Sequence, residues 1–346
     1  MYPKVSDLIN DLFGTSINLP IQSYGLFLAL AFLTGTWLLY KELDRKEKEG
    51  ILIPEKKFIL KGAPPTFMEL LAYFAFSFVA GWKIVGFIID YEIFVNDPQE
   101  YIFSLQGSLL GGILISLAYT GYFYLLKLKN KQDTPDKKEV NIQPRQQAMP
   151  IQLIVATFSV LYYGHRHGIR WKYLADAVSP SLIIAYGIGR IGCQLAGDGD
   201  WGIVNTAPKP GWLAFLPDWT WSYTYPHNIL NEGVPIPGCE GAHCYELAEA
   251  VFPTPLYETT MAVIIFFILW SLRKRIGTPG VLFSIYLMFN GLERFLIEKI
   301  RINNVFDLFG LQVTQAEVIS SVIFLTGLGL FIYCQQTKKT TIHESA

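Results

Sequence analysis

The sequence lacks an excess of charge of either sign. Its 28 lysines and arginines are balanced by 29 aspartates and glutamates, which leaves a formal net charge of −1. A basic domain or stripe, the electrostatic footprint of a nucleic-acid-binding protein, is therefore not expected. Histidine and cysteine are also scarce, with 5 and 4 copies in 346 residues, and they do not recur at metal-ligand spacings. We accordingly expect no metal ion, no cofactor and no nucleic-acid partner.

The start of the chain also lacks the basic n-region and the small-residue cleavage site of a secretory signal peptide. We therefore interpret the first apolar run as a retained span. What the sequence does have is apolar residues: 51% of the chain is hydrophobic, gathered in long runs without alternation. About 20 consecutive apolar residues form a helix that crosses a bilayer, where a helix satisfies its own backbone polar groups. Seven runs are of this kind: 21–40, 67–89, 106–126, 174–193, 255–272, 279–298 and 316–334.

These runs predict an all-α fold, a polytopic membrane helix bundle of about seven transmembrane helices, which forms a single integral-membrane domain over residues 1–346. The basic residues indicate its orientation, because Lys and Arg concentrate in cytoplasmic loops. The basic clusters lie at 41–61, 127–145, 165–172, 273–275 and 338–339. Between them, 91–105 has no Lys or Arg and 194–254 has only Lys209. Seven spans put every basic cluster inside, with the N-terminus extracytoplasmic and the C-terminus cytoplasmic.

Two segments are not predicted to span the membrane. The apolar run at 150–163 holds roughly 14 residues, a length that suits an interfacial or re-entrant piece better than a span. Counting it as an eighth span would put one of the basic clusters on the outside. The stretch 127–149 is polar and is predicted to be a flexible cytoplasmic loop.

The segment 194–254 is then a large extracytoplasmic insertion, rich in tryptophan and proline. Aromatic residues of this kind settle at membrane interfaces. The insertion is either a compact cap over the bundle, or a lid or docking platform for a substrate. It contains Cys239 and Cys244, which form either a small disulfide loop or two free thiols. Cys193 and Cys334 sit in apolar runs and are expected to be packing residues.

Three places put ionisable groups at or inside an apolar run, where charge is costly and usually functional. In GRIGCQLAGDGDWG, residues 189–202, Arg190 lies near the outer end of the fourth span, followed by Asp198 and Asp200. These groups are either a structural ion pair at a helix end or part of a site. In FPTPLYE, residues 252–258, Tyr257 and Glu258 open the fifth span. Glu258 is either a first-turn charge favoured by the helix dipole or a site residue.

The third place is GLERFLIEKIR, residues 291–301. Arg294, Glu298 and Arg301 are spaced i, i+4 and i+7 and are predicted to share one helical face. Two arginines held by a glutamate between them would make a fork suited to a phosphate. The alternative is an exposed salt bridge of small energy. Taken together, the three places predict a cavity near the outer leaflet that binds an anionic lipid headgroup.

These motifs resemble those of the prolipoprotein diacylglyceryl transferase family. GRIGCQLAGDGDWG is similar to the family signature around Gly-Arg-Ile-Gly-Asn, FPTPLYE to its Pro-Thr/Ser-x-Leu-Tyr-Glu segment, and GLERFLIEKIR to its Arg-x-x-x-Glu-x-x-Arg pattern. Further similarities, in the same order along the chain, are PIQSYG at 20–25, FVNDP at 94–98, QGSLLGG at 106–112 and ADAVSP at 175–180. The resemblance therefore covers most of the chain.

The resemblance implies transfer of a diacylglyceryl group from phosphatidylglycerol to the lipobox cysteine of a preprolipoprotein. A thioether would form and glycerol phosphate would leave. The implied partners are phosphatidylglycerol, the preprolipoprotein signal peptide and membrane lipid, and the implied location is the bacterial inner (plasma) membrane. The candidate catalytic residues are Arg190, Arg294, Glu298, Tyr24, Asp198 and His227. The candidate substrate-binding residues are Arg190, Arg294, Arg301, Gln106, Gly107, Tyr257, Glu258 and Asp200.

The sequence also departs from the family pattern. The family's histidine in His-Gly-Gly aligns with Gln106, which cannot act as a general base. The asparagine after Gly-Arg-Ile-Gly is Cys193 here, and the later acidic position falls on Asp198 or Asp200. His227, extracytoplasmic in the predicted topology, could substitute as base or could be a structural loop histidine. An anionic-phospholipid-binding or transport protein without transferase activity, or a transferase with another acceptor, is therefore a second hypothesis.

Overall fold

The computed structural model describes residues 1–19, 21–52, 55–61, 65–90, 106–129, 136–142, 171–303, 305–308 and 311–344. The chain divides into two compact units. The first unit comprises Met1–Glu55 and Gln143–Ala346, and the second comprises Lys56–Ile142. The apolar run at 150–163 lies outside the described residues.

Every one of the seven predicted spans coincides with a helix. The first unit contains α1 (Val5–Phe13), α2 (Ser23–Lys48), α9 (Trp171–Ala196), α10 (Thr254–Leu272), α11 (Val281–Glu298) and α12 (Gln315–Glu344), and the second contains α3 (Phe67–Ile89) and α6 (Leu109–Lys129). Six helices of the described chain are long and apolar enough to cross a membrane: α2, α3, α6, α9, α10 and α12. The seventh, α11, has 18 residues and carries Glu293, Arg294 and Glu298. The prediction of a polytopic helical membrane bundle is therefore confirmed.

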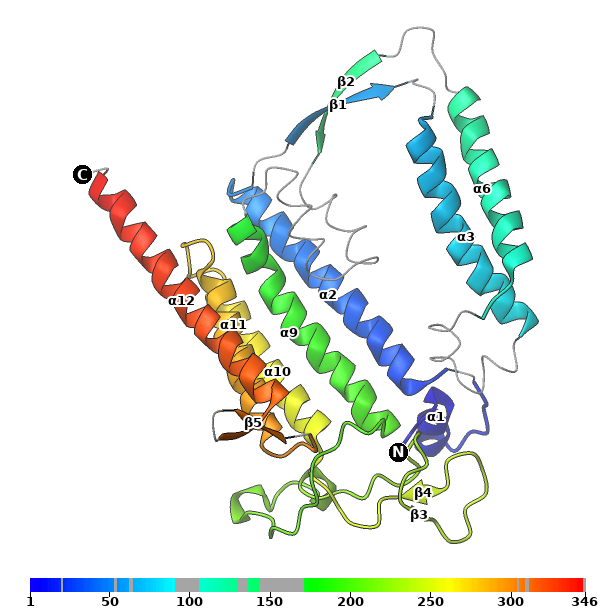
Figure 1. Ribbon diagram of the computed structural model, residues 1–346, viewed down its shortest axis with the longest axis vertical. Coiled ribbons are helices and arrows are strands. Elements are labelled where there is room, and N and C mark those ends of the chain that lie inside the picture. The colour runs from blue at the N-terminus through cyan, green and yellow to red at the C-terminus, as the bar shows by residue number, and fades with distance from the viewer. Residues whose placement is uncertain are drawn as a thin grey trace. The chain divides into compact units, whose positions relative to one another are not determined.

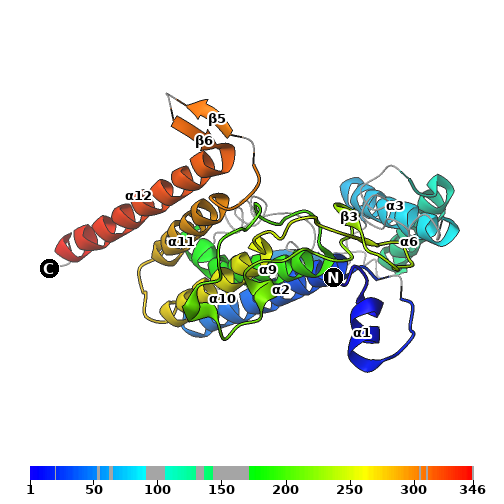
Figure 2. The same ribbon diagram turned by 90° about the horizontal axis from the view of Figure 1, so that it is seen from below.

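Helix α9 is the centre of the first unit. It packs against α2, α10 and α11, while α12 packs along the far side of α11 (Figures 1 and 2). Leu38 of α2, Ile183 of α9, Leu269 of α10 and Leu282 of α11 form one buried apolar cluster. Small residues allow the close approach of these helices. A Cβ at Gly187 of α9, for example, would lie 2.8 Å from the Cβ of Ala262 in α10. The helices are thus held by packing, and their outward faces carry large exposed apolar side chains suited to lipid.

The second unit is built on the antiparallel helices α3 and α6. Thr66 and Glu69 form a capping box that begins α3. Strands β1 (Glu55–Lys61) and β2 (Asp136–Ile142) form a two-stranded sheet. Strand β2 falls within the stretch predicted to be a flexible loop, so part of 127–149 is regular structure, while 130–135 and 143–149 lie outside the described residues.

The insertion 194–254 lies at the end of the first unit where α9 ends and α10 begins (Figure 1). It is mostly irregular chain, with short turns η1 (Gly211–Leu213) and η2 (Asp218–Thr220) and the paired strands β3 (Val234–Pro235) and β4 (Tyr245–Glu246). It has its own small core of Trp201, Tyr225 and Val251. A second hairpin, β5 (Val305–Leu308) and β6 (Leu311–Thr314), connects α11 to α12. We refer to residues 194–254 as the cap.

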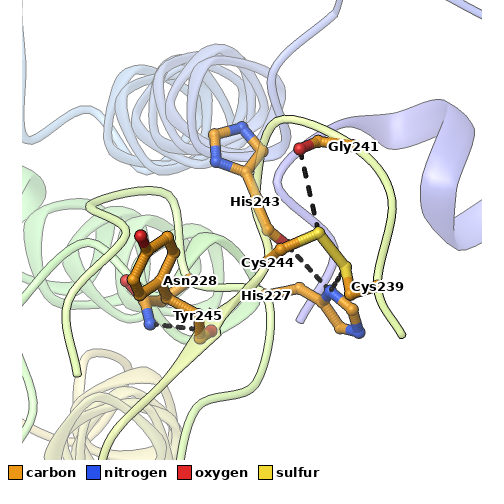
Figure 3. The surroundings of a disulfide bond; sticks show 7 residues. All are labelled: His227, Asn228, Cys239, Gly241, His243, Cys244 and Tyr245. Atoms are coloured by element: carbon orange, nitrogen blue, oxygen red, sulfur yellow. Dashed lines mark hydrogen bonds between the residues drawn. A yellow bond between two sulfur atoms is a disulfide. The ribbon is translucent and has the colours of Figure 1, made fainter. Parts of the chain in front are cut away.

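The structure distinguishes between the two states proposed for the cap cysteines. Cys239 and Cys244 are joined by a disulfide bond next to the β3–β4 hairpin (Figure 3). The other two cysteines, Cys193 and Cys334, are free and buried, as expected for packing residues.

Candidate functional site

Three arginines from separate parts of the sequence meet around one glutamate. Arg190 lies near the C-terminal end of α9, Arg294 near the end of α11, and Arg301 just beyond α11. All three contact Glu258 of α10: Arg190 Nε lies 2.9 Å, Arg301 Nη1 3.4 Å and Arg294 Nη1 3.5 Å from its carboxylate oxygens. The Glu258 side chain is 0% exposed. A buried carboxylate requires such compensation, so Glu258 is the residue that gathers the arginines.

Two further carboxylates complete this group. Asp200 pairs with Arg190 and, at 2.5 Å, with Nη2 of Arg301. Glu298 pairs with Nη2 of Arg294 at 3.2 Å and accepts a 2.6 Å hydrogen bond from Asn303. We call the six charged residues the Arg190 cluster: Arg190, Arg294, Arg301, Asp200, Glu258 and Glu298. The formal charges of the cluster sum to zero. Each guanidinium nevertheless carries five N–H donors, so the arginines can still donate hydrogen bonds to a ligand.

Arg294 is the cation of the cluster most available to a ligand. Its side chain is 30% exposed, compared with 17% for Arg190 and 14% for Arg301. Its contacts, at 3.2 and 3.5 Å, are also longer than the 2.5 Å contact of Arg301 with Asp200. A phosphate that binds Arg294 would therefore have to displace weaker ion-pair contacts than one that binds Arg301.

One part of the sequence interpretation of this group is wrong. Arg294, Glu298 and Arg301 were expected to share one helical face, with Glu298 holding both arginines. Helix α11 ends at Glu298, so Arg301 lies beyond the helix and pairs with Asp200 and Glu258 instead. The i, i+4 pair of Arg294 with Glu298 is present as expected.

Backbone contacts fix the three sequence motifs against one another. Gly202 of the cap forms an isolated antiparallel bridge with Arg301, and Ile203 N donates to Ile300 O at 2.8 Å. A Cβ at Gly202 would lie 2.4 Å from Ile300 O, so only glycine fits at this approach. Thr254, at the start of α10, donates from Oγ1 to the Asp200 carbonyl at 2.5 Å. The motifs at 189–202, 252–258 and 291–301 are thus joined by direct contacts as well as by charge.

Asp198 and Asp200 differ in their electrostatic surroundings. For Asp200, burial alone would raise the carboxyl pKa, but the guanidiniums of Arg190 and Arg301 outweigh burial and lower it. For Asp198, burial raises the pKa and the neighbouring Asp200 raises it further. Among the described residues, no Lys or Arg forms an ion pair with Asp198. Asp200 therefore stays ionised, while Asp198 is the carboxylate that can exchange a proton.

One group of possible metal ligands occurs in the described part of the chain. The ligand atoms of Cys193, Asp198 and Asp200 lie within 4.8 Å of one another. A cation bound there would meet the two guanidiniums that already neutralise Asp200. The group of Cys193, Asp198 and Asp200 is thus better suited to binding a proton than a metal ion.

Three other candidates lie elsewhere in the first unit. Tyr24, in the first turn of α2, packs on Gly192, where a Cβ would lie 3.2 Å from the Tyr24 Cα. The Tyr257 hydroxyl donates to the carbonyl of Thr220 in the cap at 3.0 Å, so its hydrogen bond holds a cap loop. His227 lies beside the disulfide, with Nδ1 2.8 Å from the His243 carbonyl oxygen (Figure 3).

Gln106 and Gly107 belong to the second unit. The Gln106 carbonyl accepts a 2.9 Å hydrogen bond from Lys83. Gly107 lies against Trp82, where a Cβ on the glycine would be 2.5 Å from the indole Nε1. The role of Gln106 and Gly107 in substrate binding stays a prediction.

Four residues near the cluster were not singled out from the sequence: Tyr186, Glu293, Asn303 and Thr254. Tyr186 lies under the Arg190 guanidinium, 5.1 Å from the ring centre, and donates to Glu293 at 3.4 Å. Asn303 and Thr254 hold Glu298 and the Asp200 backbone, as described above. Tyr186 precedes Arg190 by one helical turn, and Thr254 lies within the FPTPLYE motif, so both had a signal in their spacing.

Comparison with known proteins supports the resemblance of the motifs. The model of the prolipoprotein diacylglyceryl transferase family matches residues 152–333, more than half of the chain. A protein of Symbiobacterium thermophilum named phosphatidylglycerol–prolipoprotein diacylglyceryl transferase is 31% identical over 183 residues, which cover 51% of this chain and 56% of that protein. The chain thus spans little more than half the length of this relative.

Longer alignments are found at lower identity. A protein of the same name from Leptospira interrogans serovar copenhageni is 25% identical over 323 residues, 87% of this chain and 77% of that protein. Another, from Lysinibacillus sphaericus, is 26% identical over 236 residues, 68% of this chain and 77% of that protein.

Proposed function

The chain belongs to the prolipoprotein diacylglyceryl transferase family, and from this we propose that it transfers a diacylglyceryl group from phosphatidylglycerol to the lipobox cysteine of a preprolipoprotein. The observation that carries the proposal is the Arg190 cluster. It joins three guanidiniums at one end of a membrane helix bundle and leaves Arg294 partly exposed. A phospholipid can present its phosphate to such a group while its acyl chains remain in the bilayer.

The reaction is a displacement at carbon. The cysteine thiolate attacks the carbon of the diacylglyceryl group that carries the phosphate ester. A C–S bond forms, the C–O bond between that carbon and the phosphate breaks, and glycerol phosphate leaves with the electron pair. Negative charge grows on the departing phosphate. Guanidiniums placed in advance around that phosphate stabilise the transition state more than the ground state. Arg294 provides the direct contact, while Arg190 and Arg301, held by Glu258 and Asp200, fix the surrounding positive charge.

The thiol must lose its proton before it attacks. Gln106 cannot accept that proton. Asp198 is the best-suited acceptor among the described residues of the site, because its carboxylate has no arginine partner and its pKa is raised. The other three carboxylates of the site are bound by arginine, which weakens them as bases. Asp198 thus takes the role that a histidine has elsewhere in the family.

The proposed location follows from the same chemistry. Lipoprotein precursors and phosphatidylglycerol meet at the outer face of the bacterial inner membrane. With the cap and the Arg190 cluster outside, the N-terminus is extracytoplasmic, the C-terminus is cytoplasmic and the basic clusters lie inside. The scheme requires no cofactor, because the cysteine thiolate is the nucleophile and glycerol phosphate is the leaving group.

An assay with purified protein tests the proposal directly. Protein in detergent or in vesicles is mixed with phosphatidylglycerol and a lipobox peptide, and the thioether product is measured by mass spectrometry. Arg190→Ala and Arg294→Ala should each lower product formation by roughly 1,000-fold in the protein that remains folded. Full turnover by both variants would reject the site.

Gln106 motivates a second candidate function, that of a phospholipid-binding or transport protein without transferase activity, or a transferase with another acceptor. The same assay separates these possibilities. Retained binding of phosphatidylglycerol with no thioether product, under conditions where a family member with the histidine is active, would favour binding alone.

A further inference from the structure

The cap carries a loop, residues 207–221, that we call the aromatic loop. At its tip, Trp212 is 75% exposed and Phe215 is 80% exposed. Trp201 and Trp221 behave differently: Trp201 is buried in the cap core, and Trp221 packs edge-on against Phe252. Trp201 and Trp221 therefore help to build the cap, whereas Trp212 is displayed on its surface.

The base of the aromatic loop is held firmly. Trp221 donates from its indole Nε1 to the Ala207 carbonyl at 2.9 Å, which closes the loop. Asn205 donates from Nδ2 to the Trp221 carbonyl at 2.7 Å. Lys209 and Asp218 form an ion pair across the loop at 3.1 Å. These contacts hold the base of the loop in place. The aromatic rings at its tip therefore stay exposed and do not fold back onto the cap.

The position of the loop indicates what covers its tip. Tyr257, in the first turn of α10, donates to the carbonyl of Thr220 at 3.0 Å. The loop therefore lies beside the start of α10, a helix that is long and apolar enough to cross a membrane. The end of such a helix is expected near the headgroup region. The residues from 210 to 217 carry no charge, and the flanking charges Lys209 and Asp218 neutralise each other at the base. This pattern of an apolar aromatic tip on a charged base is typical of an interfacial anchor.

We propose that Trp212 and Phe215 insert into the interfacial layer of the phospholipid bilayer beside α10 and anchor the cap to the lipid surface. The inference concerns the membrane contact of the cap and does not depend on the transferase reaction. It assigns the otherwise unexplained exposed aromatic residues of the cap to lipid rather than to water.

Spin labelling in vesicles tests the proposal. Trp212→Cys and Phe215→Cys are labelled with a nitroxide, and the full-length protein is placed in vesicles of phosphatidylcholine and phosphatidylglycerol. Power saturation then compares collisions with oxygen, which partitions into lipid, and with a water-soluble nickel chelate. Labels at 212 and 215 should favour oxygen severalfold more than a matched label in Asp218→Cys, whose side chain on the same loop is 99% exposed. Unmodified protein provides the background, because Cys193 and Cys334 are buried.

Equal nickel accessibility at 212, 215 and 218 would overturn the proposal. Protection of positions 212 and 215 only after a lipobox peptide is added would also overturn it and would identify the loop as a peptide-docking surface. Thermal unfolding of the labelled proteins should match that of the unmodified protein, because both native side chains are largely exposed.

Discussion

Two buried ion-pair clusters lie near opposite ends of α9. They differ in whether their arginines keep hydrogen-bond donors available to a ligand. The second, which we call the Glu42 cluster, comprises Glu42 and Arg45 of α2 and Arg273 at the end of α10. The Glu42 side chain is 2% exposed and is contacted by Arg45 at 2.5 Å and by Arg273 at 3.0 Å. Arg45 also pairs with Glu49 at 2.5 Å.

The cations of the Glu42 cluster are held by short contacts. Arg273 joins α10 to Glu42 of α2, whereas Arg45 pairs with Glu42 and Glu49 within and at the end of α2. The Arg273 guanidinium lies 3.2 Å from the centre of the Trp270 ring and donates to the Trp270 carbonyl at 2.5 Å. In the Arg190 cluster, by contrast, Arg294 is 30% exposed and its ion pairs are long. The comparison teaches that a buried ion pair alone does not identify a binding site. Exposure combined with weakly used donors is the better sign, because a ligand can then gain contacts without breaking strong ones.

The largest effect should separate the two clusters by what each variant loses. Arg294→Ala should lower the transferase rate roughly 1,000-fold, since it removes a cation that stabilises the leaving phosphate. It should also lower the stability, because the buried Glu298 carboxylate loses its arginine partner. Arg273→Ala should lower the stability by about 3 kcal/mol, because it leaves Glu42 buried with fewer partners, and the folded protein should keep its rate. Both quantities are measured on protein purified in the same detergent.

Arg294→Lys provides the matched control, because it keeps the charge but loses the fork of donors. Its rate should fall between those of the Ala variant and the unmodified protein. If folded Arg273→Ala lost activity while folded Arg294→Ala kept it, the distinction between the clusters would be reversed.

The next largest effect concerns the proton acceptor. Asp198→Asn should lower the rate roughly 100-fold, because it removes the general base. Burial and the nearby Asp200 raise the pKa of Asp198, so the unmodified enzyme should gain activity as pH rises through a value above the usual carboxyl range. Asp200, whose pKa is lowered, stays ionised throughout that range. The variant should lose this acidic limb. A pH–rate profile that keeps the limb in Asp198→Asn would exclude Asp198 as the base.

The sequence predicted the participants of the site better than their pairing. Arg190, Arg294, Arg301, Glu258, Glu298 and Asp200 were all identified, because charge inside apolar runs is a strong signal. The pairing of Arg301 was not, because α11 ends at Glu298 and Arg301, beyond the helix, bridges to Gly202 in a distant segment. Periodicity continues a helix past its last residue unless a tertiary contact ends it.

In the fold, elements with a local sequence signal were predicted, and elements that depend on tertiary contacts were not. Long apolar runs predicted seven of the eight α-helices in the described residues, since the hydrophobic signal of a span is local. The short helix α1 was not predicted. Strand β2 was missed because its residues, DKKEVNI, are polar and lack the alternation that predicts a strand. The Glu42 cluster was missed for a related reason. Glu42 and Arg45 lie in a segment rich in charge, where only the packing of α2 against α9 and α10 reveals which charges are buried.

A smaller effect should distinguish positioning from charge within the Arg190 cluster. In Gly202→Ala, the new Cβ would meet Ile300 O at 2.4 Å and Phe252 Cβ at 2.9 Å. The backbone next to Arg301 must then shift, which should cost about 2–3 kcal/mol of stability and raise KM for phosphatidylglycerol more than it lowers kcat. Gly329→Ala is the matched control, because no atom lies within 4 Å of a Cβ at that position. Equal behaviour of the two variants would show that the Gly202 contact does not position Arg301.

The smallest effect is expected in the disulfide hairpin of the cap. The bond closes a loop with a sequence separation of 5, so the variant Cys239→Ser/Cys244→Ser should lose only up to about 2 kcal/mol, seen as faster proteolysis near β3 and β4. Because Cys239 Sγ lies 3.9 Å from His227 Nδ1, the variant also alters the surroundings of that histidine. If Asp198 is the base, the pH–rate profile should stay unchanged in this variant. A shifted acidic limb would transfer the role of base to His227 and would place catalysis in the cap hairpin rather than beside the Arg190 cluster.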